Sequence, residues 1–461
     1  MSVGGGPTVA AKGKTVIATA VATCMDFPAA ARAVIDAGPV CDSCLGRVFA
    51  DRSFGLSNAD RGEGLRTAVA IADDEPYEGV APADCWVCDG ACGRFDEWAE
   101  RAVDALGDPE FDTYQVGTRT PPLIEENDRL LREDAGLPDD AGELFKSNFN
   151  REVGKRIGRL TDTEVEFGRP DVQFTLDLDA GRVDTKLNSA FVYGRYRKLE
   201  RGIPQTEWPC RECHGSGLQG SRPCEHCDGE GYLYPESVEE LTAPIVEDVM
   251  GGTAATFHGA GREDVDAKML GTGRPFVVEI EEPQRRRIDV ERLEGDINAF
   301  ADGKVEVEGL RLADYEMVER VKGLDASKTY RAEVEFDADV SDAELTDAIS
   351  EIDGATVEQD TPQRVDHRRA SKTRTREVLS ASVEREDARH AAVDIHGEGG
   401  LYIKELISSD EGRTEPSLAG LLDVEATVTA LDVLAVEGTE EPFEREEFFL
   451  DDDSDGDNDN N

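Results

Sequence analysis

Residues 257–276, FHGAGREDVDAKMLGTGRPF, combine four glycines with two arginines and three acidic residues. The stretch has neither a helical nor an alternating apolar pattern, so it predicts an exposed, glycine-rich turn. An arginine neighbour favours the ionised form of a carboxyl group. An ionised and oriented carboxylate suits a nucleophile or a general base. A carboxylate of this turn is therefore a candidate catalytic group.

Other chemistries fit this turn and the rest of the chain poorly. A calcium loop starting at Asp264 would need a closing glutamate where Pro275 stands. The GTGRP stretch is not followed by the GK[ST] of a phosphate loop. No Ser-His-Asp or HExxH arrangement is visible among the six scattered histidines.

The ten cysteines include four CxxC pairs, which in a cytosolic chain indicate metal more often than disulfides. The pairs predict two closed zinc tetrads with structural roles, Cys41, Cys44, Cys85 and Cys88, and Cys210, Cys213, Cys224 and Cys227. The second tetrad resembles the zinc modules of DnaJ-type chaperones. Only two such units occur and no HPD tripeptide is present, which disfavours a chaperone. Cys24 and Cys92 are expected to be buried thiols, and Cys92 could replace a neighbour in the first tetrad.

The elements that position these residues alternate between helices and strands, so we predict an α+β fold with a mixed sheet. Residues 143–160 predict a basic amphipathic helix and residues 171–199 predict three strands. We expect the following division: a flexible N-terminus with a short strand (1–25), a zinc-binding segment (26–100), a region of alternating helices and strands (101–204), a zinc insert (205–235), a long mixed α/β domain (236–449) and a disordered acidic tail (450–461).

The net charge of the 461-residue chain is -50, spread through segments with clear helix and strand patterns. This distribution is typical of a protein adapted to a cytoplasm at molar salt, where the Debye length is about 3 Å. No apolar run of membrane-spanning length and no signal peptide is visible, so the sequence predicts a cytoplasmic protein. The absence of coiled-coil heptads favours a monomer.

Three basic stretches reverse this acidity, at 194–204, 284–287 and 363–376. Basic segments hold a polyanion by its phosphates, so we expect RNA contacts there. The alternative is local ion pairing with the acidic surface. The candidate RNA contacts are Arg195, Arg197, Lys198, Arg364, Arg368, Arg369, Lys372, Arg374 and Arg376.

GREDVDAKMLGTGRPF resembles the catalytic motif of RNA pseudouridine synthases, specifically the archaeal and eukaryotic family ten of those enzymes. KTYRAEV (328–334), GLYIKELISSDEGRTEPSLAGLL (400–422), CDSCLGRVF and RYRKLERGIPQT resemble further stretches of that family. The similarity covers most of residues 40–440, and the acidity favours a haloarchaeal member. The resemblance implies a mixed-sheet synthase domain, a THUMP-type RNA-binding domain and an archaeal zinc insert.

The resemblance also implies an activity: isomerisation of uridine to pseudouridine at position 54, position 55 or both in the TΨC arm of tRNA, without a cofactor for the chemistry. Asp264 would attack the ribose or the uracil, or act as a base. Either Arg262 or Arg274 would pair with Asp264, while Tyr330 would stack on the flipped uracil. Tyr402, Ile403, Lys404 and Leu431 would line the pocket. The competing class is a non-catalytic tRNA-binding module with the same THUMP and zinc parts.

Overall fold

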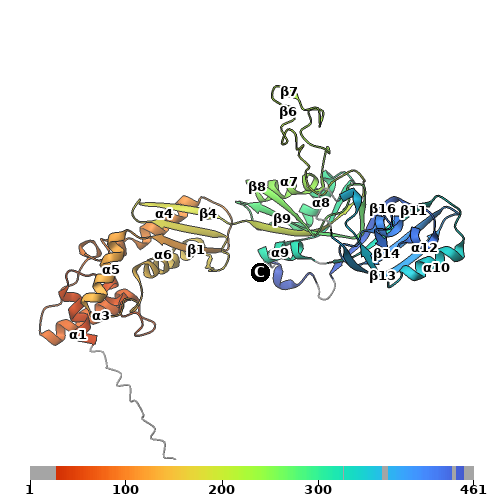
Figure 1. Cartoon of the computed structure of the whole chain (residues 1–461). Helices are drawn as coiled ribbons and strands as arrows, with labels where there is room; N and C mark the ends of the chain where they lie inside the picture. The colour runs from red at the N-terminus through yellow and green to blue at the C-terminus, as the bar shows by residue number, and fades with distance from the viewer. Residues whose placement is uncertain (1–26, 325, 366–371, 439–442, 451–461) are drawn as a thin grey trace, which may run out of the picture. The chain divides into compact units, whose positions relative to one another are not determined.

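The computed structural model describes residues 27–324, 326–365, 372–438 and 443–450 (Figure 1). Several expected features lie outside these ranges: Cys24, Asp366, Arg368, Arg369, the expected N-terminal strand, and residues 451–461 of the expected acidic tail. The chain forms two compact units: the first comprises residues 27–103, 116–161 and 175–184 of the described chain, and the second comprises the rest. No helix in the described ranges is both long and apolar enough to cross a membrane.

Helices dominate the first unit. They are α1 (Phe27–Asp36), α2 (Asp42–Arg47), α3 (Asn58–Asp73), α4 (Phe95–Leu106), α5 (Pro122–Asp134) and α6 (Phe145–Thr161). The α3 helix begins at a capping box in which Ser57 and Asp60 satisfy each other's backbone amides. The basic helix expected at 143–160 is confirmed as α6, which buries Phe145, Phe149 and Ile157 on one face.

A four-stranded sheet has the order β2-β1-β3-β4. Its strands are β1 (Thr113–Arg119), β2 (Glu164–Val165), β3 (Val172–Asp177) and β4 (Arg182–Leu187). Residues on β3 alternate between buried and half-buried positions, as one apolar face requires. Together with β5 (Ala190–Lys198), β3 and β4 confirm the three strands expected at 171–199.

A ten-stranded mixed sheet dominates the second unit, with the order β10-β5-β9-β16-β11-β14-β13-β12-β15 and with β8 paired to β9. Its further strands are β8 (Ala254–Gly259), β9 (Lys268–Glu281), β10 (Val305–Ala313), β11 (Ala326–Phe336), β12 (Thr356–Gln359), β13 (Arg374–Arg385), β14 (His390–Gly397), β15 (Thr414–Glu415) and β16 (Ala426–Gly438). Because β9 and β16 pair in parallel while the neighbouring pairs are antiparallel, the expected mixed sheet and α+β class are confirmed.

Helices cover this sheet and bury its apolar side chains. They are α7 (Val238–Met250), α8 (Val290–Phe300), α9 (Tyr315–Gly323), α10 (Asp342–Ile352), α11 (Ile403–Ser408) and α12 (Leu418–Leu422). Figure 1 shows α7 and α8 beside β8 and β9, and α10 and α12 beside β11 and β14. One core joins β5 and β9 to α7 and α8, and a second joins β11 and β14 to α10, α11 and α12. A small hairpin, β6 (Leu218–Gln219) and β7 (Arg222–Pro223), belongs to the cysteine-rich insert.

The backbone at Gly271 requires a glycine, which explains the first glycine of the GTGRP stretch. It lies on β9 at a φ of 55°, and a Cβ placed there would be 1.9 Å from the carbonyl oxygen of Leu434 on β16. Only glycine lets β9 pass this close to β16, and the parallel pair places the preceding turn next to β16.

Gly271→Ala is therefore expected to destabilise the protein by at least about 2 kcal/mol, because it combines a left-handed backbone with a backbone clash. Gly303→Ala is the matched control, since Gly303 also has a positive φ of 77° but open space around its Cβ. It should cost only about 1 kcal/mol. Denaturant unfolding in molar KCl measures both, and equal losses would show that the approach to Leu434 is unimportant.

Candidate active site

The turn that carries Asp264 connects β8 to β9 and comprises residues 260–267. It closes through a hydrogen bond from the backbone N–H of Ala267 to the carbonyl of Asp264, at 3.0 Å. The side chain of Asp264 is 41% exposed, whereas that of its neighbour Glu263 is 1% exposed. The expected exposed turn is present, and its two consecutive acids lie in opposite environments.

Glu263 lies in a buried ionic cluster beneath the turn. Its carboxylate is 3.0 Å from Nε of Arg274 and 3.7 Å from Nζ of Lys198, and both bases are almost fully buried. The hydroxyl of Tyr196 donates to the same carboxylate at 2.9 Å. Gln205 donates to Tyr196 and to the carbonyl of Gly261, so the cluster reaches the start of the turn.

Lys198 ties this cluster to the backbone of the turn. Its Nζ donates to the carbonyl of Ile203 at 2.8 Å and to the carbonyls of Asp264 and Val265 at 3.3 Å each. Burial lowers the pKa of Lys198, and the charge of Glu263 opposes that effect. Burial raises the pKa of Tyr196 well above its ordinary value, so its hydroxyl keeps the proton that it donates.

Asp264 is held by two cations from the other side of the turn. One of its carboxylate oxygens is 3.4 Å from Nη1 of Arg364 and 3.3 Å from Nζ of Lys404. Arg364 is itself anchored by the buried carboxylate of Glu405 at 2.7 Å, and Lys404 contacts Asp266 at 2.9 Å. Burial alone would raise the pKa of Asp266, but the hydrogen bond from Lys404 brings it below the ordinary value.

The expected pair between Asp264 and Arg262 or Arg274 is corrected by this geometry. Arg274 is committed to Glu263, because a guanidinium that is 1% exposed needs a buried countercharge. The guanidinium of Arg262 lies over the ring of Trp208, 5.2 Å from its centroid. The basic partners of Asp264 come from distant parts of the sequence, the segment before residue 366 and the start of α11.

The other residues expected to line the pocket differ in exposure. Tyr330 lies on β11, and burial, opposed by Arg274 and assisted by Asp264, raises its pKa to about 12. The ring of Tyr402 is half-buried under the guanidinium of Arg374, at 5.6 Å. Ile403 and Leu431 are buried in the core that α11 shares with the sheet.

Several candidate RNA contacts are engaged within the protein instead. Lys198 is fully buried, so its prediction as an RNA contact is wrong. Arg195 donates to three backbone carbonyls and pairs with Glu444, and Arg197 pairs with Glu306 and Glu308. Ion pairing with the protein's own acids, the alternative weighed for the basic stretches, describes these residues better.

The last basic stretch is only partly described. Arg374 donates to Thr361 and Arg376 to the carbonyl of Gly399, so both support local structure. Lys372 is exposed, while Arg368 and Arg369 lie outside the described residues. In the basic stretch at 284–287, Arg286 pairs with Asp171 and Arg287 with Asp112.

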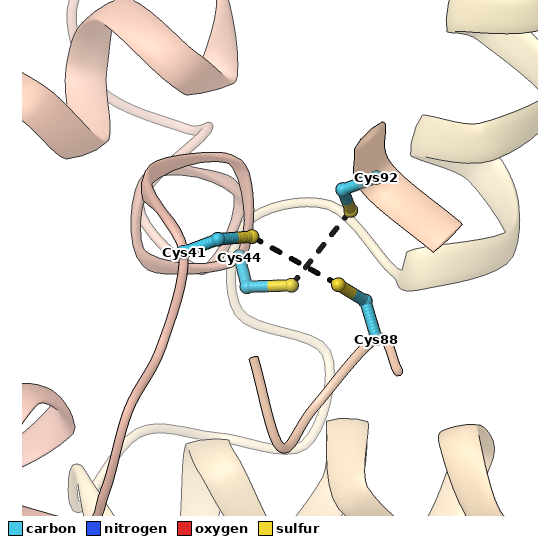
Figure 2. Close-up of side chains that lie close together, drawn as sticks. All are labelled: Cys41, Cys44, Cys88 and Cys92. Carbon is cyan, nitrogen blue, oxygen red and sulfur yellow. Dashed lines mark hydrogen bonds between the residues drawn. The ribbon is translucent and has the colours of Figure 1, made fainter. Parts of the chain in front are cut away.

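Four cysteine thiols gather in the first unit, and they differ by one residue from the expected tetrad. Figure 2 shows Cys41 opposite Cys88 and Cys44 opposite Cys92, with sulfur separations of 3.9 and 3.8 Å. Cys92 takes the place expected for Cys85, because the short helix at Ala91–Gly93 carries its sulfur into the cluster. Cys85 is buried nearby.

The second cluster unites the expected residues Cys210, Cys213, Cys224 and Cys227. Its sulfur separations are 3.8 Å for Cys210 and Cys224 and 3.7 Å for Cys213 and Cys227. The backbone N–H of Gly231 donates to the sulfur of Cys227 at 3.2 Å.

Both clusters fit a tetrahedral metal ion. Four thiolates at a metal–sulfur distance of about 2.3 Å have sulfur atoms about 3.8 Å apart, as both clusters do. All eight thiols are buried, and four thiolates are the donor set that zinc takes in structural sites. A four-thiolate site has no open coordination position, so a metal ion bound in either cluster would hold loops together.

Sequence reasoning missed Glu263, Tyr196, Gln205 and Glu405 as supports of the site. Glu263 stands next to Asp264 in the sequence, but an acid beside another acid gave no signal for which one is buried. Tyr196 and Gln205 belong to the RYRKLERGIPQT stretch, whose basic residues predicted contacts with RNA phosphates instead. Glu405 follows Lys404 directly, and only the fold shows that it faces Arg364.

Comparisons with known proteins support one family. The family model described as "Pus10, C-terminal" matches residues 191–437, and the model described as "Pus10 THUMP domain, archaeal" matches residues 98–177. The chain is 72% identical to the tRNA pseudouridine synthase Pus10 of Halorubrum lacusprofundi, over 92% of this chain and all of that protein. It is 43% identical to the protein of the same name from Methanothrix thermoacetophila, over 90% of this chain and 95% of that one.

Replacing Glu263 by glutamine should destabilise the protein by about 3–5 kcal/mol, because two buried cations lose their only carboxylate within the described cluster. Glu306→Gln is the matched control: it removes one exposed partner of Arg197 and should cost about 0–1 kcal/mol. Thermal and denaturant unfolding measure both variants. A loss for Glu263→Gln as small as that of the control would contradict the description of the cluster.

The two clusters predict about two bound zinc ions per chain in protein prepared without chelator. Cys92→Ser should reduce this to one, because it removes a ligand of the first cluster, whereas Cys85→Ser should leave two. Native mass spectrometry or elemental analysis counts the metal. The reverse pattern would show that Cys85 is the ligand, as the CxxC spacing alone suggested.

Proposed function

Because the chain belongs to the Pus10 family of tRNA pseudouridine synthases, we propose that it isomerises uridine 54, uridine 55 or both in the TΨC arm of tRNA, with Asp264 as the catalytic carboxylate. The observation that carries the proposal is the environment of Asp264. Of the three acids on this turn, Glu263 is fixed underneath, Asp266 is exposed and pairs with Lys404, and Asp264 is accessible and oriented by two cations. An oriented carboxylate that remains accessible is what a nucleophile or base requires.

The reaction changes the uracil atom that is bonded to the ribose. The bond between ribose C1′ and uracil N1 breaks, the base rotates, and a bond from C1′ to C5 forms. C5 loses a proton and N1 gains one, so atoms and electrons balance within the nucleotide. Asp264 attacks the ribose, attacks the uracil or removes a proton to assist elimination, and the three routes remain alternatives.

Arg364 and Lys404 suit the role of orienting Asp264. Both contact the same carboxylate oxygen, which leaves the other oxygen of Asp264 for the substrate. Each cation also has a second acid, Glu405 for Arg364 and Asp266 for Lys404, and these acids restrict its position. A carboxylate fixed in this way reacts without first reorganising its surroundings.

Tyr330 suits the role of stacking against a flipped uracil. Its pKa of about 12 keeps the hydroxyl protonated at neutral pH, and the charge of Asp264 contributes to raising that pKa. Flipping a base from its stack costs a few kcal/mol, which stacking on an aromatic ring helps to offset. Tyr402 would add a second ring, and the buried Ile403 and Leu431 would shape the pocket from behind.

The two cysteine clusters are proposed to hold structural zinc. The first would stabilise the N-terminal unit, and the second would close the insert at 205–235. The THUMP-type region at 98–177 is proposed to bind the tRNA. Residues 236–449, together with β5, are proposed to form the catalytic part. Zinc would supply folding free energy to these segments, and the chemistry would remain with the side chains around Asp264.

Asp264→Asn should abolish pseudouridine formation while the variant still folds and binds tRNA, because the change is nearly isosteric and removes only the charge. Tritium release from [5-³H]uridine-labelled tRNA measures turnover, and filter binding measures affinity. Asp339→Asn is the matched control, since Asp339 forms an exposed pair with Arg389. Clear activity in Asp264→Asn would refute the assignment, and no activity in the wild type would favour a non-catalytic tRNA-binding module.

A further inference from the structure

Phe54 is exposed in a way that folding does not explain. It lies on the loop at 48–57 between α2 and α3, and 97% of its surface is accessible. Burying a phenylalanine side chain stabilises a protein by about 1.5–3 kcal/mol, so a fully exposed ring forgoes that contribution. Its neighbours Ser53 and Gly55 have φ values of 59° and 92°, a tight conformation that projects the ring between them.

The loop around Phe54 is held by a buried arginine. Nε of Arg61 donates to the carbonyl of Arg52 at 2.9 Å, and its Nη2 donates to those of Ser53 and Leu56 at 3.4 and 3.2 Å. Its Nη1 donates to Oδ1 of Asn58 at 2.5 Å. The backbone on both sides of Phe54 is therefore fixed by one guanidinium, so presenting the ring to a partner costs little conformational entropy.

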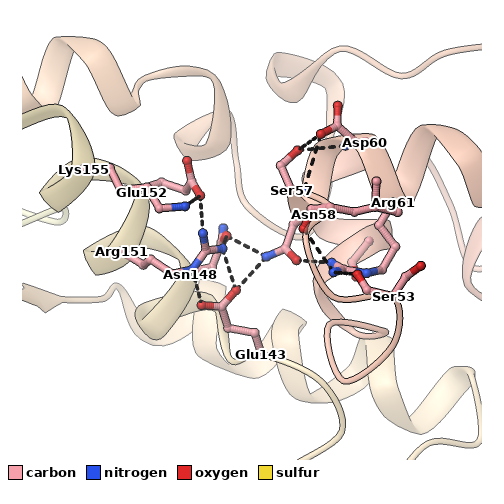
Figure 3. A network of polar contacts seen from close by, with 12 residues as sticks. Ser53, Ser57, Asn58, Asp60, Arg61, Glu143, Asn148, Arg151, Glu152 and Lys155 are labelled. Atoms are coloured by element: carbon pink, nitrogen blue, oxygen red, sulfur yellow. Dashed lines mark hydrogen bonds and ion pairs between the residues drawn. The ribbon is translucent and has the colours of Figure 1, made fainter. Parts of the chain in front are cut away.

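The same polar network connects the loop to the basic helix α6. Figure 3 shows Asn58 between Arg61 on one side and Asn148 and Glu143 on the other, at 2.8 and 2.7 Å. Glu143 in turn binds Arg151 of α6 at 2.9 Å. The loop that carries Phe54 and helix α6 thus share one rigid support within the first unit.

Helix α6 has five bases and one acid in a chain whose acids outnumber its bases two to one. Lys146, Lys155 and Arg159 of this helix are exposed, and Lys155 also lies 3.5 Å from the carboxylate of Glu152. Proteins hold unpaired nucleotides by combining an aromatic ring with nearby positive charge. The nucleobase stacks on the ring, and the phosphates pair with lysine and arginine side chains, here those of the helix.

We propose that Phe54 is a stacking platform for an unpaired base of the tRNA substrate, with exposed lysines of α6 contacting the phosphates beside it. That the ligand is RNA rests on the proposed function. A protein partner is less well matched, because a specific protein interface needs about 800 Å² on each side and Phe54 stands on a loop among polar residues. Stacking is uncharged, so it is not opposed by the chain's net charge of -50.

Phe54→Ala should weaken binding of tRNA by about 5- to 150-fold, the range for losing one base–aromatic stack. The factor should be the same at every KCl concentration, because no charge is removed. Lys155→Gln should instead reduce the slope of log Kd against log[KCl] by about 0.7–0.9. Phe54→Trp should restore tight binding, since another aromatic ring can stack.

Ile71→Ala is the matched control, because Ile71 is also exposed in the first unit, at 76%, but lies on the regular helix α3. It should leave Kd unchanged. The proposal is overturned if Phe54→Ala binds tRNA as tightly as the wild type. It is equally overturned if Phe54→Ala changes only the oligomeric state, measured by light scattering, which would indicate a protein contact. Because the readout is binding, it is independent of turnover: an inactive wild type would refute the proposed function and leave this result intact.

Discussion

The buried pair between Glu263 and Arg274 is the interaction on which the site depends. Two consecutive acids on the turn face opposite ways, so fixing Glu263 underneath determines where Asp264 emerges. Lys198 and Tyr196 complete the cluster, and Lys198 also binds the carbonyls of Asp264 and Val265. A buried ion pair is a costly way to gain stability, but it permits few alternative arrangements. The close contact of β9 with β16 at Gly271 and the hydrogen bonds of Gln205 then stabilise the same conformation of the turn.

In the described part of this acidic chain, several arginines organise the protein itself. Arginines that the local base excess marked as RNA contacts instead hold backbone carbonyls or acids, as Arg195 and Arg197 do on β5. Arg364 joins Glu405 to Asp264 and thereby becomes part of the site. A cluster of basic residues in a strongly acidic protein therefore indicates internal ion pairs at least as well as it indicates a binding site for a polyanion. Helix α6 combines both situations: Arg151, Lys155 and Arg156 pair with acids, while Lys146 and Arg159 are exposed.

The sequence was sufficient for features that depend on local patterns. The turn around Asp264, the helix at 143–160, the strands at 171–199 and the second cysteine cluster all follow from spacing or periodicity within a short window. Partners that come from far apart in the chain were not predictable in this way. Asp264 and Arg364 are 100 residues apart, and their contact depends on the order of strands in the large sheet. Cys92 and Cys85 are indistinguishable by residue type, and the short helix that carries Cys92 decides between them.

The rate of the chemical step in Glu263→Gln tests the central claim most directly, since this variant keeps the Asp264, Arg364 and Lys404 side chains and changes only the buried cluster beneath the turn. It is measured as tritium release in a single turnover with tRNA fully bound, at a temperature where the variant is folded. If the buried cluster fixes the turn, the rate should fall on the order of 100-fold while the Kd for tRNA stays near that of the wild type, because small displacements of a reacting group have large effects. A folded Glu263→Gln with the wild-type rate would contradict the account, because Asp264 would then be oriented without the cluster.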